Sequence, residues 1–251
     1  MHGILYRLVD KDSQDILLMA EDLRGFFIGA DEEPRQTVVF AGTRYVKKVK
    51  RVTESAVLEV VGRQMESIGS YYIGRITREA LESPNIQEGG EGYPDVKYSF
   101  HGSACEYPWA GEIWRMWSAN RPDAPGEWVQ YPSEYHASWL HVVQTAWFSS
   151  GLRATRYQTA EMVRLDGAVA VTRDAFYCAI GEAVNGPGGY FGSNLDALYD
   201  CLRTMKRDGG SPFRLEWSDS LVSRGALGGE FTGSVISMFE EFGVCVDLAD
   251  D

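Results

Sequence analysis

Two carboxylates, Asp196 and Asp200, lie four residues apart in the segment GGYFGSNLDALYDCL, which spans residues 188–202. On a helix this spacing places both side chains on one face, where their repulsion opposes helix formation by about 0.2–0.5 kcal/mol. Tyr190 and Tyr199 lie close to them in the sequence and would supply rigid contact area with a polar tip. The pattern favours a surface that binds a positively charged partner.

The helix that would carry these carboxylates begins near Asn194 and buries a face of leucines. The leucines recur three and four residues apart, at Leu195, Leu198 and Leu202. A purely structural explanation of Asp196 stays open, because Ser193 or Asn194 could be the N-cap and the first turn of a helix favours an anion. Asp200 lies more than one turn inside the helix, so capping does not explain it, although a solvated acidic face would.

From about residue 160 the sequence alternates between strand and helix patterns. The expected elements are a strand or short strand pair in 162–171, a helix in 172–187, the helix from about 194, a strand in 211–217, a helix in 229–243 and a last strand in 244–251. Strands separated by helices predict an α/β fold, with a small parallel sheet and helices packed on it.

The sequence up to about residue 155 is typical of strands and loops. Residues 56–76 predict a β-hairpin with a turn at Gly62 and Arg63, and residues 83–95 and 118–127 predict loops. One helix is expected before the second domain, with Ser133 as its N-cap. We therefore predict two domains: a β-rich (α+β) N-terminal domain over 1–157, of unknown role, and an α/β domain over 158–251 that folds by itself.

The charge of the chain limits its partners. The formal net charge is −12, and residues 160–251 contribute 15 acidic against 7 basic side chains, which is −8 of that total. Nucleic acids and anionic membranes bind clustered Lys and Arg, so neither is an expected partner. No stretch reaches the roughly 18 apolar residues of a membrane span, and the N-terminus lacks a signal-peptide pattern. The sequence predicts a cytoplasmic protein whose four cysteines stay reduced and mostly buried.

Read as a whole, GYFGSNLDALYDCL resembles the central motif of the barstar family of intracellular ribonuclease inhibitors. The following PFRLEW and the final VCVDL fall where that family has its next strand and its last strand. The resemblance covers about residues 160–251. It implies a barstar-like fold for this domain and a basic ribonuclease as its partner.

The resemblance also implies roles for individual residues. Asp200 matches the aspartate that enters the nuclease active site, where its carboxylate replaces a substrate phosphate and meets Arg, Lys and His groups. The surrounding contact positions match Tyr190, Asn194, Asp196 and Tyr199, and the contact glutamate matches Glu241 or its neighbour Glu240. The founding inhibitor has tryptophan in place of Tyr199 and an aromatic residue in place of Met205. These two departures predict that the partner is not barnase itself.

Two other groups of residues allow alternative interpretations. The spacings H-x3-C and H-x4-H lie near metal-ligand spacing, but no CxxC or HExxH accompanies them, so we expect neither a metal nor another cofactor. These residues are His101, Cys105, His136 and His141. Six of the seven tryptophans fall within residues 109–147, where they would form either an aromatic core or a second binding surface.

Together these patterns predict an immunity protein or antitoxin rather than an enzyme. It would block the active site of a basic ribonuclease or nuclease toxin by acidic mimicry of the substrate. One alternative is an interaction module that binds a basic protein other than a nuclease. Another is an enzyme or metal protein that uses the His and Cys residues of the N-terminal part. The N-terminal domain is also a candidate for binding a second protein partner.

Overall fold

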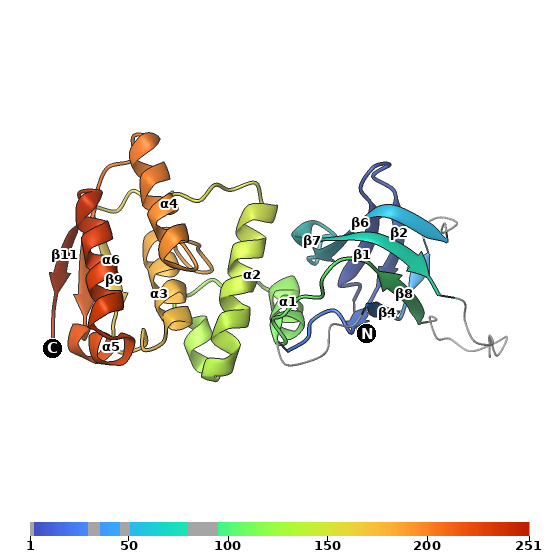
Figure 1. Ribbon diagram of the computed structural model, residues 1–251, viewed down its shortest axis with the longest axis horizontal. Helices are drawn as coiled ribbons and strands as arrows, with labels where there is room; N and C mark the ends of the chain where they lie inside the picture. The colour runs from blue at the N-terminus through green and yellow to red at the C-terminus, as the bar shows by residue number, and fades with distance from the viewer. Residues whose placement is uncertain (1–2, 30–35, 46–50, 80–94, 251) are drawn as a thin grey trace. The chain divides into compact units, whose positions relative to one another are not determined.

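The computed structural model describes residues 3–29, 36–45, 51–79 and 95–250. The chain divides into two compact units, an N-terminal unit of Met1–Asn120 and a C-terminal unit of Arg121–Asp251 (Figure 1). The first is built on an antiparallel sheet and the second on a small parallel sheet with packed helices. This confirms the predicted α/β class with a β-rich region before it.

The N-terminal unit has eight strands and one helix in its described residues. In chain order these are β1 (Tyr6–Asp10), β2 (Ile16–Ala20), β3 (Asp22–Arg24), β4 (Thr37–Ala41), β5 (Arg44–Tyr45), β6 (Val52–Val61), β7 (Ser67–Arg78), β8 (Val96–Phe100) and α1 (Ala110–Ala119). The hairpin predicted over 56–76 is confirmed by β6 and β7, and the Gly62 amide donates to the Glu66 carbonyl in its turn (2.9 Å). The loop predicted over 83–95 lies, apart from Asp95, outside the described residues.

The N-terminal sheet closes on itself. Its strand order is β3-β4-β8-β7-β6-β1-β2-β5. Only Glu21 separates β2 from β3, and only Gly42 and Thr43 separate β4 from β5. Because β3 pairs with β4 while β2 pairs with β5, the same two stretches of chain form both ends of the strand order. Alternate side chains therefore face a common interior, which they fill as a core.

Helix α1 corrects the expectation that this region contains only strands and loops. Its buried side chains recur at helical spacing, at Ala110, Ile113, Trp114 and Trp117. The Trp114 indole Nε1 donates to the Tyr71 hydroxyl on β7 (2.7 Å), which fixes the helix against the sheet. The loop predicted over 118–127 is correspondingly shorter, because α1 extends to Ala119 and a 3-10 helix begins at Glu127.

The C-terminal unit contains three strands and seven helical segments, all within the described residues. They are η1 (Glu127–Gln130), η2 (Ser133–Tyr135), α2 (His136–Ser149), β9 (Met162–Asp166), α3 (Arg173–Asn185), α4 (Leu195–Arg207), β10 (Arg214–Ser218), α5 (Ser220–Leu227), α6 (Gly229–Glu241) and β11 (Cys245–Leu248). Ser133 begins η2 rather than capping α2, because a 3-10 turn precedes that helix. None of the four cysteines, which all lie in the described ranges, forms a disulfide, and only Cys245 is exposed.

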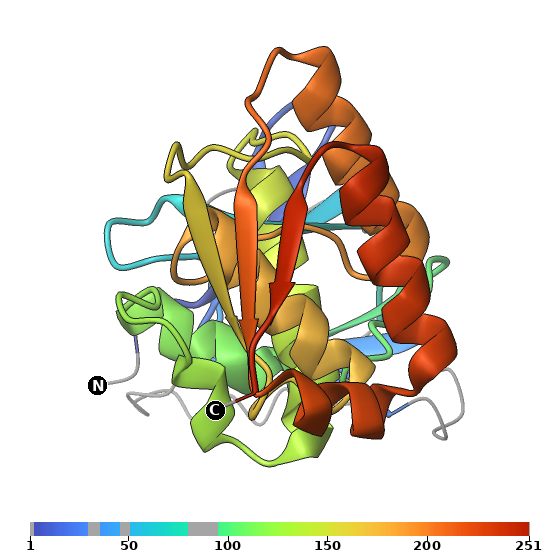
Figure 2. The same cartoon turned by 90° about the vertical axis from the view of Figure 1, so that its left-hand side faces the viewer.

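The three strands of the C-terminal unit are parallel and lie in the order β11-β10-β9 (Figure 2). Their inward side chains are buried, and α3 and α6 pack against the outer strands β9 and β11. The buried set is Val163, Leu165, Leu215 and Trp217. The opposite face carries ion pairs, including Arg164 with Glu216 (3.2 Å). Across the described residues, every helix is too short or too polar to span a lipid bilayer.

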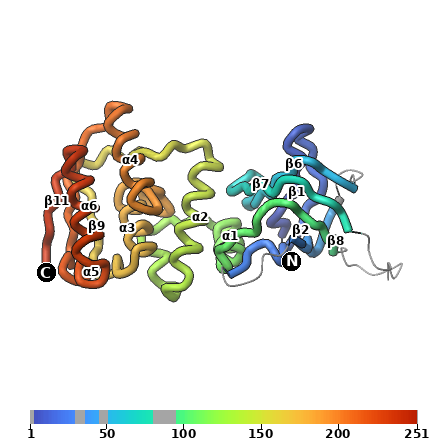
Figure 3. The backbone as a smooth tube through the Cα atoms, viewed as in Figure 1, coloured from blue at the N-terminus to red at the C-terminus, as the bar shows by residue number. Residues whose placement is uncertain are grey.

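Helix α2 belongs to the C-terminal unit, because it packs against α3 (Figure 3). The compact units consequently divide between Asn120 and Arg121, before α2, whereas the composition of the sequence placed the boundary at 157/158. Residues 121–157 therefore form an additional layer on the domain that the sequence predicted to begin at 158.

Candidate functional site

Helix α4 is positioned by a capped N-terminus and a close-packed loop. Asn194 has extended backbone and is its N-cap, with the side-chain Oδ1 accepting from the Ala197 amide (2.8 Å). Gly192 precedes it with a φ of +103°, and a Cβ at that position would lie 2.7 Å from the Leu198 nitrogen. Only glycine fits this approach. Of the two predicted caps, the structure thus selects Asn194 rather than Ser193.

The two aspartates are both exposed on α4, and a different interaction stabilises the negative charge of each. Asp196 lies in the first turn, where the helix dipole favours an anion. Asp200 lies further along and forms an ion pair with Arg203, its Oδ1 being 2.7 Å from Nη2. More than half of each side chain in this pair is exposed, so a partner has access to the Asp200 carboxylate.

Tyr199 brings the end of α6 next to these aspartates. Its hydroxyl donates to Glu241 Oε1 (3.4 Å), and its ring packs edge-on against Phe242 with the ring centroids 5.1 Å apart. The bond singles out Glu241 rather than Glu240 as the glutamate beside Tyr199. Helices α4 and α6 therefore present Asp196, Asp200 and Glu241 around one tyrosine, and we call these four residues the acidic surface.

Tyr190 is not part of the exposed acidic surface. Its side chain is only 2 % exposed, and its ring packs against that of Phe148 on α2, at 5.3 Å between centroids. Burial raises the pKa of its hydroxyl, while a hydrogen bond with Ser193 opposes that rise. Of the residues that the resemblance implied, Asp196, Tyr199, Asp200 and Glu241 lie on α4 and α6 and Asn194 caps α4, whereas Tyr190 packs against Phe148 of α2.

Two cations beside the acidic surface were not predicted. Arg203 pairs with Asp200, and the Lys206 ammonium lies 5.6 Å from the centroid of the Phe242 ring. The i, i+3 spacing from Asp200 to Arg203 was visible in the sequence and could have identified the pair. The contact of Lys206 with Phe242 joins α4 to the residue after α6, so only the folded chain reveals it.

The His and Cys residues that suggested a metal site are divided between the two units. His101 and Cys105 lie in the N-terminal unit, and His136 and His141 lie on α2. In the ranges described above, no three His, Cys, Asp or Glu side chains are grouped to hold a metal ion. Burial lowers the pKa of His136 and brings that of His141 to about 4, so both rings are neutral near pH 7.

The neutral ring of His141 is expected to make the protein sensitive to acid. Its pKa is 6.5 in a solvated chain and about 4 in the folded protein, so the unfolded state binds more protons between these values. The contribution of His141 to stability is therefore complete above about pH 6.5 and decreases toward pH 4, by at most about 3–4 kcal/mol. Asp174 and Glu182, whose pKa values burial raises, act in the opposite direction.

Urea unfolding of the wild type and of His141→Gln between pH 4 and 7 measures this contribution. The free energy of unfolding of the variant should depend less on pH, because glutamine does not titrate while the two carboxyl groups are unchanged. If the pH profiles of the two proteins are parallel, the pKa of His141 is the same in the folded and the unfolded chain, and the prediction is wrong.

The tryptophan-rich segment forms core rather than a binding surface. Five of its six tryptophans are at most 9 % exposed: Trp114, Trp117, Trp128, Trp139 and Trp147. The first two belong to the N-terminal unit and the other three to the C-terminal unit. Of the two interpretations of this segment, burial therefore favours an aromatic core, divided between the units.

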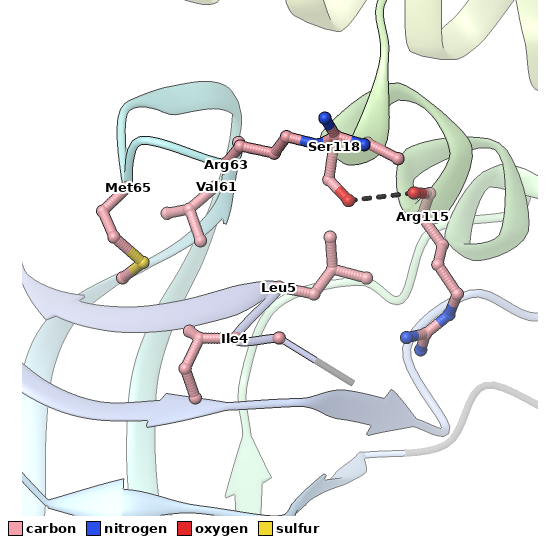
Figure 4. Close-up of a pocket in the computed structure, with 10 residues that line it drawn as sticks. Ile4, Leu5, Val61, Arg63, Met65, Arg115 and Ser118 are labelled. Atoms are coloured by element: carbon pink, nitrogen blue, oxygen red, sulfur yellow. Dashed lines mark hydrogen bonds between the residues drawn. The ribbon is translucent and has the colours of Figure 1, made fainter. Parts of the chain in front are cut away.

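The N-terminal unit contains a pocket of about 510 Å³ (Figure 4). It lies between the start of β1, the turn that joins β6 to β7, and α1. Its apolar lining includes Ile4, Leu5 and Val61, and Arg63 extends along its rim toward Ser118. A pocket lined by apolar side chains and by the two arginines Arg63 and Arg115 is compatible with many ligands, so a second protein partner for this unit stays a prediction.

Comparison with known proteins identifies the region that carries the acidic surface. No curated protein and no solved structure matches the chain. Residues 160–245 match the family model described as Barstar (barnase inhibitor). This confirms the resemblance expected for that region: the C-terminal third of the chain, from the start of β9 to that of β11, is a Barstar family region.

Proposed function

We propose that this protein is an inhibitor of a basic ribonuclease or nuclease toxin, and so an immunity protein or antitoxin. The observation that supports this most directly is the acidic surface, formed by exposed carboxylates around Tyr199 inside the Barstar-matched region. A nuclease must concentrate positive charge to bind a polyanion, and a folded acidic surface can occupy that charge without offering a bond to cleave. In this proposal the chain catalyses nothing itself.

Within this proposal Asp200 occupies the cationic centre of the nuclease. Its carboxylate is at the middle of α4, and its present partner is a single exposed arginine that can move away. Asp196 and Glu241 lie beside it and would meet neighbouring cations, while Tyr199 would pack at the centre of the contact. We also propose a cytoplasmic location, which agrees with four cysteines that form no disulfide.

Capture by the intact protein tests the proposal. The full chain is immobilised, exposed to cell extract at low salt, and eluted at high salt, with an Asp200→Ala chain as the matched control. We expect a basic protein that binds the wild type only, that degrades RNA or DNA, and that loses this activity when the soluble full chain is added at one equivalent. A captured basic protein without nuclease activity would favour the alternative of an interaction module.

Arg203 is expected to slow the association with such a nuclease. It carries positive charge into a surface that must approach a cationic site, and it competes for the Asp200 carboxylate. Arg203→Ala should therefore raise the association rate roughly two- to tenfold at low salt, and less at high salt. Arg164→Ala, which removes an arginine from the Glu216 ion pair on the sheet, is the control of equal charge. Slower association of Arg203→Ala alone would indicate an acidic group on the partner opposite Arg203.

A further inference from the structure

Residues 121–157 contact the loop that leads into α4, although they lie outside the Barstar-matched region. The link is Glu182 on α3, whose side chain is buried. Its Oε2 accepts from the Gly126 amide (2.7 Å) and from the Trp128 indole Nε1 (3.1 Å), and its Oε1 accepts from the Gly188 amide (3.2 Å). A buried carboxylate requires such donors, so this one group ties η1 to the loop.

A second link runs through Asn185, the last residue of α3. Its Nδ2 donates to the carbonyl of Thr155 (3.0 Å) and to that of Tyr190 (2.8 Å), and its Oδ1 accepts from the Tyr157 amide (2.8 Å). The side-chain amide therefore forms hydrogen bonds through both its nitrogen and its oxygen. It joins the segment after α2 to the backbone of the loop.

The third link is the contact of Phe148 with Tyr190. Phe148 is 44 % exposed and Tyr190 is 2 % exposed, so the phenylalanine forms the outer layer and the tyrosine the inner one. Figure 3 shows α2 running alongside α3 at this side of the C-terminal unit. The loop over 186–193 contains four glycines, which by themselves would leave it many conformations. Here Glu182 and Asn185 on α3 hold the loop, each of them also bonded to residues of 121–157, and Phe148 contacts it directly.

We propose that residues 121–157 are a positioning part of the partner-binding surface, and that they exclude Tyr190 from it. This rests on the proposed inhibitory function. Phe148, Asn185 and Glu182 act as positioning residues: they hold the loop, and the loop ends at the Asn194 cap that orients α4. The partner then contacts α4 and α6 alone, and it must be a nuclease whose cationic site accepts Asp200 and Glu241 without a loop tyrosine.

This assignment has a kinetic consequence. A loop that is already ordered in the free protein does not have to be fixed during binding, which lowers the entropic cost of association. Loosening it should weaken binding roughly three- to tenfold, even though no positioning residue touches the partner. The effect should be independent of ionic strength, in contrast to that of the aspartates, because Phe148 carries no charge.

Full-chain variants test the positioning role without and with a partner. In Phe148→Ala, hydroxyl-radical labelling of Tyr190 and amide hydrogen exchange at residues 186–194 should increase at least roughly tenfold. Phe148→Tyr keeps the ring and should restore the protection, and Leu221→Ala removes an exposed apolar side chain from α5 as a control. Glu182→Gln, which retains one acceptor oxygen, should increase exchange at Gly188. Thermal melts identify any variant that fails to fold.

The same variants are then measured against the nuclease recovered by capture. Phe148→Ala should bind roughly three- to tenfold more weakly and Phe148→Tyr like the wild type, with labelling of Tyr190 in the wild type unchanged by the complex. If a nuclease binds but Phe148→Ala alters neither labelling nor binding, the positioning role is overturned and the inhibitory function stands. If Tyr190 becomes labelled in the complex, or if it is found in contact with the nuclease, its exclusion from the partner-binding surface is overturned. If no nuclease is captured, the inhibitory function itself is overturned.

Discussion

Replacing Asp200 by alanine is expected to weaken binding of the captured nuclease by about 2–5 kcal/mol, because the cationic groups of the nuclease would be desolvated without their counter-charge. The fold should change little. Asp200 is exposed, its ion pair with Arg203 is worth about 0.2–0.5 kcal/mol, and its removal also relieves the repulsion with Asp196. The free energy of unfolding should therefore stay within about 0.5 kcal/mol of the wild type.

Association and dissociation rates for a small set of variants separate charge from shape. Asp200→Asn keeps the size of the side chain and should lose most of the affinity, whereas Glu161→Ala removes an exposed charge outside the acidic surface and should lose little. Asp196→Ala should have a smaller effect than Asp200→Ala, because part of its role is to stabilise the start of α4. If Asp200→Ala inhibits as well as the wild type, α4 presents an ordinary solvated face and the proposed mode of inhibition is wrong.

Helices α3 and α4 of the C-terminal unit could be predicted because their starts are marked locally, whereas α5 (Ser220–Leu227), which has no side-chain cap, was not predicted. Thr172 accepts from the Ala175 amide at the start of α3, and Asn194 accepts from the Ala197 amide at the start of α4. Each residue is a favoured N-cap followed by apolar side chains at helical spacing. The pairing of Asp196 and Asp200 on one exposed face followed from the same spacing, so the centre of the acidic surface was visible in the sequence.

Helix α1 was missed although its apolar spacing is helical. Its aromatic residues favour strands by intrinsic preference, and they stand next to a long β-rich region. Packing against β6, together with the hydrogen bond from Trp114 to Tyr71, overrides that preference. The helical spacing of the buried residues was visible in the sequence, but the strand preference of the aromatic residues was given more weight.

The burial of Tyr190 could not be predicted from the motif around α4. Its neighbours in the sequence are those of a contact residue, and the residue that covers it, Phe148, lies about forty positions earlier in a segment that the resemblance does not include. The burial of Glu182 could not be predicted either, since two of its three hydrogen-bond donors come from η1 and the residue before it. Sequence reasoning fails here because tertiary contacts with residues 121–157 decide the exposure of these side chains.

A comparison of two fragments should show the largest effect on stability. Fragment 121–251 corresponds to the C-terminal unit, whereas fragment 158–251 corresponds to the domain predicted from composition. The shorter fragment lacks Gly126 and Trp128, so the buried Glu182 carboxylate keeps only the Gly188 donor. Each hydrogen bond lost to a charged acceptor contributes about 1.5–3 kcal/mol, and the surface that residues 121–157 cover becomes exposed to water.

Further contacts are lost with the same cut. Asn185 loses its bonds to Thr155 and Tyr157, and Tyr190 loses the cover of Phe148. The total should be about 3–5 kcal/mol or more, a large part of the roughly 5–15 kcal/mol that stabilises a typical domain.

Urea unfolding followed by circular dichroism should therefore give fragment 121–251 a cooperative transition like that of the C-terminal unit in the full chain. Fragment 158–251 should unfold at much lower urea or be unfolded without it. Glu182→Gln in fragment 121–251 serves as the intermediate case, because it removes the charge while keeping the covering segment. Equal stability of the two fragments would place the boundary at 157/158 after all, and the contacts of residues 121–157 would then contribute to neither the fold nor the binding loop.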